Sequence, residues 1–374
     1  MPYDQFDRSS LRLYSLAERN ENKNFIEQDQ VRVGVPPGAL SDAAKRVIHE
    51  TGERMRQARD IGRPVIMAFG AHSIKNGLGP LLIRLMQEGW IQHLATNGAG
   101  VIHDWEFAFQ GITGEDVRAN VDIGQFGLWA ETGFNINLAL VLGAYDGLGY
   151  GESVGRMIEC DGHDVPGRQE LLGVLGEAGE SADSAEKAAA AADLLAMIER
   201  FKLSKGRISV LHKWKRFSVQ AAAYRLGVPF TAHPMIGHDI IYTHPLNHGA
   251  AVGRTAQRDF LAYAEGISRL DGGVYLSVGS AVMSPMIFEK SFSMSQNLAL
   301  QQGRHIERHF IVVVDLAESR WDWSKGEPPM DTPDYYLRYC KTFSRMGGTM
   351  RYATADNRDF LLALCQELGV EAQD

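Results

Sequence analysis

Residues 64–104 constrain the fold of this chain more than any other stretch. They begin with an apolar run, residues 65–69, which is broken at Gly70 and followed by a polar turn and a series of leucines at helical spacing. An apolar run of this length is typical of a strand buried on both faces of a sheet. The leucine spacing is typical of a helix that buries one side.

The same pattern then recurs. Residues 90–95 are strand-like, residues 96–100 (TNGAG) form a small-residue turn, and residues 101–109 continue as an expected helix. Two successive strand, turn and helix units predict a parallel α/β sheet with ligand groups beyond the carboxyl ends of its strands. We therefore expect the functional site at that edge.

The second half of the chain adds three strand-like runs, residues 228–232, 271–280 and 310–314. The five expected strands each end in Gly, Thr, Ser, Asp or His. They fit one large, doubly wound, mostly parallel sheet with helices on both faces, a Rossmann-like α/β fold. Residues 1–35 are polar and punctuated and predict an amino-terminal arm, and residues 36–374 predict one α/β domain.

Charge and cysteine content narrow the class of protein. The chain carries 38 Lys and Arg against 46 Asp and Glu, a net charge of −8, which argues against bulk nucleic-acid binding. Its 3 cysteines form no CxxC pair, so a reduced intracellular protein is expected. There is no apolar leader and no run of apolar residues long enough to span a bilayer. These features predict a cytoplasmic protein without a membrane span.

Several candidate residues have a structural alternative. The turn at residues 96–100 either contacts a cofactor or is only a tight turn. Asp239 either binds an amine or caps the following helix, and Asp356 either contacts cofactor or starts a helix. His233, His238 and His244 lack the spacing of known metal motifs, so hydrogen-bonded core histidines are favoured and no metal is predicted.

Residues 333–341 (PDYYLRYCK) resemble the segment of deoxyhypusine synthases that runs from a Pro-Asp pair to the catalytic lysine. The resemblance extends, in family order, over most of residues 60–365. PVIMAFGAHSIKNGLGPLLIRLM resembles the family's first strand, cofactor turn and helix, and LATNGAGVIHD resembles its second glycine turn. IGHDIIYTH, DGGVYLS and ATADNRDFLLAL resemble three later segments.

This resemblance implies an NAD-dependent transferase. The family dehydrogenates a polyamine such as spermidine and passes an aminobutyl-type group through a lysine Schiff base, here on Lys341. It also implies a homotetramer with sites between subunits, the arm closing a neighbour's site. The cofactor residues it implies are Gly70, Ala71, Thr96, Asn97, Gly98, Ala99, His103, Asp315 and Asp356, and the substrate residues are His238, Asp239, His244, Tyr335 and Tyr339.

The departures from the family bear on substrate. The family's paired glutamates fall at Ile102 and His103, and an acidic residue and a tryptophan of the polyamine channel fall at Tyr335 and Tyr339. Because polyamines are cations, losing carboxylates weakens their binding. We therefore expect a retained scaffold with a changed small-amine substrate.

The lysine chemistry sets a condition on the pocket. To attack an imine, the ammonium of Lys341 must first lose its proton, so its surroundings must depress its pKa. Tyr335, Tyr339 and Trp323 are the expected apolar walls. Two alternatives stay open: a non-catalytic NAD-binding or interaction protein on the same fold, and an unrelated hydrolase using His233, His238 and Asp239. The sequence identifies no protein substrate.

Overall fold

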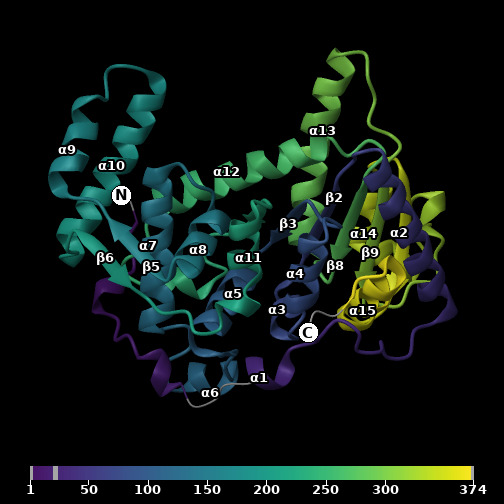
Figure 1. The fold of residues 1–374 in the computed structure, drawn as a ribbon, viewed down its shortest axis with the longest axis horizontal. Coiled ribbons are helices and arrows are strands. Elements are labelled where there is room, and N and C mark those ends of the chain that lie inside the picture. The colour runs from purple at the N-terminus through teal and green to yellow at the C-terminus, as the bar shows by residue number, and fades with distance from the viewer. Residues whose placement is uncertain (1–2, 20–23, 372–374) are drawn as a thin grey trace.

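A computed structural model describes residues 3–19 and 24–371 (Figure 1). Its centre is a six-stranded sheet in the order β10-β9-β8-β2-β3-β7, in which every neighbouring pair is parallel. The chain builds outward from β2 to one edge and then from β8 to the other, which is the doubly wound order of Rossmann folds. The predicted fold class is confirmed. The strands are β2 (Val65–Phe69), β3 (His93–Thr96), β7 (Phe230–Ala232), β8 (Val274–Val278), β9 (Phe310–Asp315) and β10 (Thr349–Thr354).

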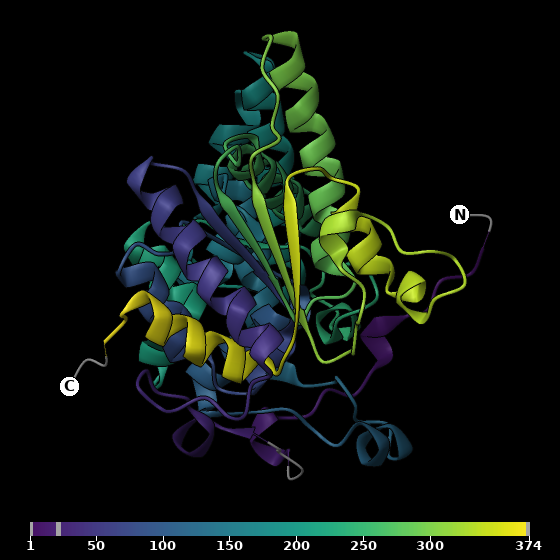
Figure 2. The same cartoon turned by 90° about the vertical axis from the view of Figure 1, so that its right-hand side faces the viewer.

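Helices cover both faces of the sheet, and alternate strand residues point to them. Met67 and Phe69 belong to one apolar cluster, whereas Ile66 and Ala68 belong to the other. Burial on both faces explains why the strands read as continuous apolar runs. Figure 2 shows the two layers on either side of the strands. The first layer contains α2 (Asp42–Asp60), α4 (Gly79–Gln87), α5 (Gly98–Gln110), α11 (Val219–Leu226) and α15 (Asn357–Leu368), and the second contains α12 (Gly249–Ser268), α13 (Met283–Gln301) and α14 (Arg338–Ser344).

A group of further helices lies beside β7, at that outer edge of the sheet. Its apolar side chains form a third, smaller cluster. The hairpin of α9 and α10 projects from the body at the upper left of Figure 1. The elements are α7 (Ala130–Asp146), α8 (Tyr150–Glu159), α9 (Arg168–Gly176) and α10 (Ala182–Phe201), with the antiparallel pair β5 (Gly162–Val165) and β6 (Gly206–Ser209).

The amino-terminal arm lies on its own chain, along the lower edge of Figure 1. Arg8 donates to the carbonyl oxygen of Tyr242 at 2.7 Å, and the Arg19 guanidinium pairs with Glu106 at 3.0 Å. The arm contains η1 (Arg8–Ser10), η2 (Leu16–Glu18), β1 (Asn24–Phe25) and α1 (Ile26–Asp29), and β1 pairs with β4 (Ile112–Thr113). The remaining short elements are α3 (Ala71–Lys75), α6 (Val117–Asp122), η3 (Lys215–Phe217), η4 (Ile240–Thr243), η5 (Trp323–Lys325) and η6 (Pro333–Tyr336).

None of the described helices combines the length with the apolar composition that crossing a bilayer requires. The three cysteines are unpaired thiols: Cys160 is exposed, and Cys340 and Cys365 are buried.

Candidate functional site

The turns after β2 and β8 meet at the point where the order of the sheet reverses. The amide of Gly70 donates to the carbonyl oxygen of Val278 at 3.1 Å, and a Cβ on Gly70 would overlap the carbonyl oxygen of Gly279. Gly279 itself has a φ of 58°, which favours glycine. In doubly wound sheets, ligands bind outside the carboxyl ends of the strands at this reversal. The predicted small-residue turn is therefore required by backbone packing at the expected place.

The polar side chains of the turn after β3 form hydrogen bonds with nearby backbone atoms. Asn97 caps α5 by accepting from the amide of Gly100 at 2.9 Å, and the Thr96 hydroxyl donates to the carbonyl oxygen of Phe69 at 3.0 Å. These bonds account for both side chains without a ligand.

A cavity of about 230 Å³, here called the arm cavity, lies beyond the carboxyl ends of β3 and β7. It is enclosed by α5, the arm, α3, residues 114–126 and residues 238–240. Four of the predicted residues line it together: Ala99, His103, His238 and Asp239. The structure thus brings predicted cofactor and substrate residues to one site.

Asp239 is the unusual group in this cavity. Its Oδ2 is buried and has no hydrogen-bond partner among the described residues. Burial raises the pKa of Asp239 to about 6, against a smaller lowering effect of His238. An unpaired buried carboxylate is costly unless a partner arrives. A ligand with a positive charge would supply that partner.

Asp239 also occupies the start of α5. Its carboxylate lies so close to Gly98 that a Cβ there would overlap Oδ2. This position is the positive end of the helix dipole, where a cofactor phosphate would otherwise be favoured. A phosphate at Gly98 and Ala99 would face the Asp239 carboxylate at short range, which disfavours an anion at this helix start.

His103 is another residue that lines the arm cavity. Its Nδ1 lies 2.8 Å from the hydroxyl of Thr113, and that hydroxyl donates to Glu106 at 2.6 Å. The hydroxyl oxygen must therefore accept from Nδ1–H, which leaves Nε2 as a hydrogen-bond acceptor. Burial lowers the pKa of His103 to about 4, so the ring is neutral near pH 7. A neutral acceptor is compatible with a cationic ligand in the arm cavity.

The base of the arm cavity is a buried ion pair that the sequence analysis missed. The side chains of Arg19 and Glu106 are 1% and 2% exposed, and the hydroxyls of Thr113 and Thr132 also donate to Glu106. The pair joins the arm to α5 and neutralises both charges locally. The partners are 87 positions apart in the sequence, so no local pattern pointed to the pair.

Lys75 was also missed. It lines the arm cavity and a second cavity of about 350 Å³, which the arm, the end of α3 and Arg358 enclose. Within residues 3–19 and 24–371, the ammonium of Lys75 has no ion-pair or hydrogen-bond partner. An unpaired lysine between two cavities is suited to an anionic group that extends across both.

Other predicted residues lie outside the arm cavity. His244 is buried, accepts from the amide of Leu246 at 3.0 Å and has a pKa lowered to about 4 by burial. Asp315 accepts from the amide of Ala317 at 3.0 Å, and Asp356 caps α15. These three hydrogen bonds hold local turns and the start of a helix, and two of them, those of Asp315 and Asp356, lie at the carboxyl edge of the sheet.

The hydrolase alternative requires His233 beside His238 and Asp239. Instead, His233 is buried against Tyr263, and its Nε2 lies 3.0 Å from the hydroxyl of Thr231. It does not line the arm cavity. The described residues also contain no group of three His, Cys, Asp or Glu side chains placed to hold a metal.

Lys341 lies in α14, and its side chain is 13% exposed. Its Nζ lies 3.2 Å from Oε1 of Glu327 and 3.2 Å from the centroid of the Tyr335 ring. Tyr339 packs nearby, with its hydroxyl 3.5 Å from that of Tyr352. The Lys341 ammonium thus forms both an ion pair with a carboxylate and a cation–π contact with a ring face.

Lys341 and Asp239 lie at opposite edges of the sheet. Asp239 follows β7, and α14 packs against β10, the two outer strands. At about 4.8 Å between neighbouring strands, the six strands span roughly 24 Å. A small amine held by Asp239 therefore does not reach Lys341 of the same chain.

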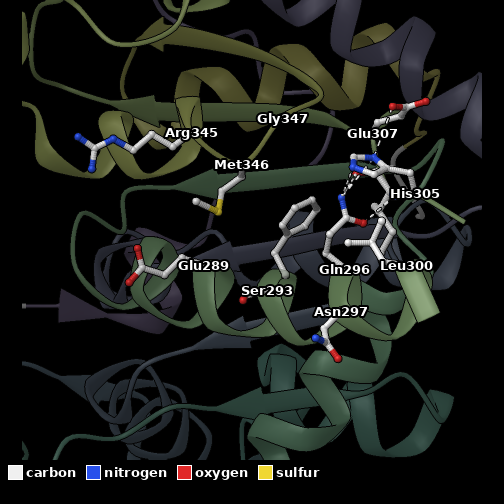
Figure 3. A pocket seen from close by; sticks show the side chains of 12 residues that line it. Glu289, Ser293, Gln296, Asn297, Leu300, His305, Glu307, Arg345, Met346 and Gly347 are labelled. Atoms are coloured by element: carbon white, nitrogen blue, oxygen red, sulfur yellow. Dashed lines mark hydrogen bonds and ion pairs between the residues drawn. The ribbon is translucent and has the colours of Figure 1, made fainter. Parts of the chain in front are cut away.

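A cavity of about 590 Å³ lies beside α13 where β9 and β10 begin (Figure 3). Three of its polar residues pair with one another: the Gln296 amide lies 3.0 Å from Nε2 of His305, and Nδ1 of His305 lies 3.4 Å from Glu307. It is at the amino edge of the sheet, away from the strand ends where doubly wound folds bind ligands. We therefore place the candidate site at the arm cavity.

No protein-family profile and no curated protein matches the sequence, so the deoxyhypusine synthase resemblance stays a prediction. Among solved structures, the ternary complex of AgrE with ornithine and NAD⁺ is similar over 88% of this chain and 34% of its own, at 15% identity and a TM-score of 0.44. ArgZ, a cyanobacterial arginine dihydrolase, is similar over 87% of this chain and 32% of its own, at 16% identity and a TM-score of 0.39. A putative LOR/SDH protein from Methanococcus maripaludis S2 is similar over 91% of this chain and 74% of its own, at 12% identity and a TM-score of 0.41.

The chain spans about a third of the length of AgrE and ArgZ. The Rossmann-like assignment rests on the strand order and register of the chain's own sheet.

Proposed function

We propose that this chain binds NAD at the carboxyl edge of its sheet and dehydrogenates a small amine held in the arm cavity. The observation that carries the proposal is Asp239, a buried carboxylate with an unpaired Oδ2 that lines a cavity at that edge. A protonated amine is the ligand that satisfies such a group. The arm cavity, of about 230 Å³, has room for a small amine or a small diamine.

The residues around the site fit a dinucleotide in two respects. The turns at Gly70 and Gly279 lie at the reversal of the sheet, which is where doubly wound folds bind their ligands. Lys75 carries an unpaired ammonium between two neighbouring cavities, which suits the phosphates. When bound, NAD supplies the hydride acceptor.

The chain's own groups would then prepare the amine. The ammonium must lose one proton before hydride leaves the carbon that bears the nitrogen, and the products are an iminium ion, NADH and that proton. Asp239 is placed to receive the proton, and its pKa of about 6 is close to the working range of a general base. The neutral His103 ring offers a second acceptor for the amine.

Calorimetry tests both halves of the proposal. We expect saturable binding of NAD, weakened about tenfold or more in Lys75→Met but not in Lys45→Met, because a charge-assisted contact contributes roughly 1.5 to 3 kcal/mol. We expect putrescine to bind the NAD-saturated protein and to be lost in Asp239→Asn. The control is Asp331→Asn, which removes an exposed carboxylate remote from β7. NAD binding without any amine binding would favour the non-catalytic alternative.

Transfer of an aminobutyl-type group through Lys341 is a further step that needs a second subunit. Because Lys341 and Asp239 lie at opposite edges of one sheet, the lysine of one copy would have to approach the arm cavity of another. The burial of Lys341 against Tyr335 supports a role beyond surface charge. Borohydride trapping with NAD and spermidine tests this step: an adduct on Lys341 supports it, and NADH formation without any adduct on Lys341 contradicts it.

A further inference from the structure

A further cavity lies at the amino edge of the sheet and has no part in the proposed amine chemistry. It measures about 480 Å³ and lies where β3 and β7 begin, beside α12 and the turn from α2 to β2. Arg59, Arg63 and Arg269 line it, and none of its described lining residues is acidic. In a chain with a net charge of −8, this cavity concentrates positive charge.

The three arginines have no strong ion-pair partner among the described residues. Arg59 lies over the Trp90 ring, 4.4 Å from its centroid, which orients the guanidinium without neutralising it. Within the described chain, neither Arg59 nor Arg63 forms an ion pair. Arg269 meets Glu265 at 3.6 Å in a surface pair, a kind of contact that is weak in water. Their charges are therefore available to a ligand.

A buried histidine adds a second, independent feature. His93 is 4% exposed, lines the cavity and is held by a 3.0 Å contact between Nε2 and the hydroxyl of Thr231. Its Nδ1 lies beside Gly266, which also lines the cavity, and a Cβ on Gly266 would come within 3.1 Å of it. The ring nitrogen that Thr231 does not engage is thus on the cavity side. An anion there would favour the imidazolium form, in which Nδ1–H donates.

The rest of the lining is apolar and includes Pro64, Ile66 and Pro229. Inorganic anions gain nothing from such a surface, whereas an organic anion buries apolar area against it. Several guanidinium groups match the charge and the several oxygens of a phosphate monoester better than a single carboxylate. We propose that this cavity binds a small phosphate monoester with an apolar body, at a site separate from the arm cavity.

Calorimetric titration with phenyl phosphate at constant ionic strength tests the proposal. We expect saturable binding that is tighter than that of inorganic phosphate or benzoate. Arg63→Gln and Arg269→Gln should each weaken it about tenfold, as expected for loss of one charge-assisted bond. Both arginines are exposed, so these variants should keep their fold.

The matched control is Arg46→Gln, which removes one exposed positive charge from α2 away from the cavity. It should leave the affinity for phenyl phosphate unchanged. Three results would overturn the proposal: no saturable binding by the wild-type chain, an equal loss in Arg46→Gln and Arg63→Gln, or benzoate or inorganic phosphate binding as tightly as phenyl phosphate.

Discussion

The carboxylate of Asp239 lies directly against Gly98, the first residue of α5, and a Cβ on Gly98 would overlap its Oδ2. Gly98→Ala should therefore push Asp239 out of place. We expect a loss of roughly 1 to 3 kcal/mol in the free energy of unfolding, as for other overpacked sites. Putrescine binding should weaken at the same time. Urea unfolding and calorimetry measure the two effects.

The control for this substitution is Gly253→Ala. Gly253 lies within α12, is exposed and has nothing near the position of a new Cβ. Alanine is a better helix former there, so a gain of about 0.5 to 1 kcal/mol is expected. If the free energy of unfolding changed in Gly98→Ala in the same way as in Gly253→Ala, the contact between Gly98 and Asp239 would not be as close as the structure has it.

The pKa of Asp239 predicts a pH dependence of stability. Burial raises it from 3.8 to about 6, so the protonated form is favoured in the folded chain. The associated stability is present below the unfolded pKa and is lost as the pH rises through about 6. Asp239→Asn removes this dependence, so the stability gain of the variant over the wild type should grow by about 1 to 1.5 kcal/mol between about pH 5 and pH 8. Urea unfolding at both pH values should show no such growth for Asp331→Asn.

The arm should depend on its buried ion pair. Arg19→Met leaves the Glu106 carboxylate buried without its cation, and such a break costs about 3 to 5 kcal/mol. Arg12→Met removes an exposed arginine of the same arm that lies over Tyr14, 5.0 Å from the ring centroid. That contact contributes about 1 kcal/mol at most. Unfolding free energies that fall equally in the two variants would argue against the anchoring role of Arg19.

A second buried aspartate, Asp259, has a structural role. Burial raises its pKa to about 7, and its Oδ2 accepts from the amides of Gly151 at 2.9 Å and Ala232 at 2.7 Å. Asp259→Ala leaves two buried N–H groups without an acceptor, so we expect a loss of about 2 to 5 kcal/mol. Glu265→Ala, on the exposed side of the same helix, should stay within about 0.5 kcal/mol of the wild type. Chemical denaturation distinguishes the two.

The sequence identified the buried strands well because burial on both faces leaves continuous apolar runs. β2 and β9 were located to within a residue of their bounds in the structure. β10 was not counted because its apolar signal is broken: Met350 is buried while Arg351 and Tyr352 are partly exposed.

The site was predictable only in part, for a physical reason. Parallel strands share a carboxyl edge, so the proximity of His103 and Asp239 followed from the fold class. The distance from Asp239 to Lys341 did not follow, because it depends on the strand order, which puts β7 and β10 at opposite edges. Arg19 and Glu106 are paired across a long stretch of chain and left no local signal.

The most direct test of the account is NADH formation from putrescine, followed by absorbance at about pH 8 in the wild-type chain, Asp239→Asn and Asp331→Asn. The account predicts turnover in the wild type and Asp331→Asn at similar rates, and a loss of about 100-fold or more in Asp239→Asn, the effect of removing a general base. Equal turnover in Asp239→Asn, or no NADH from the wild type with either putrescine or spermidine, would contradict it.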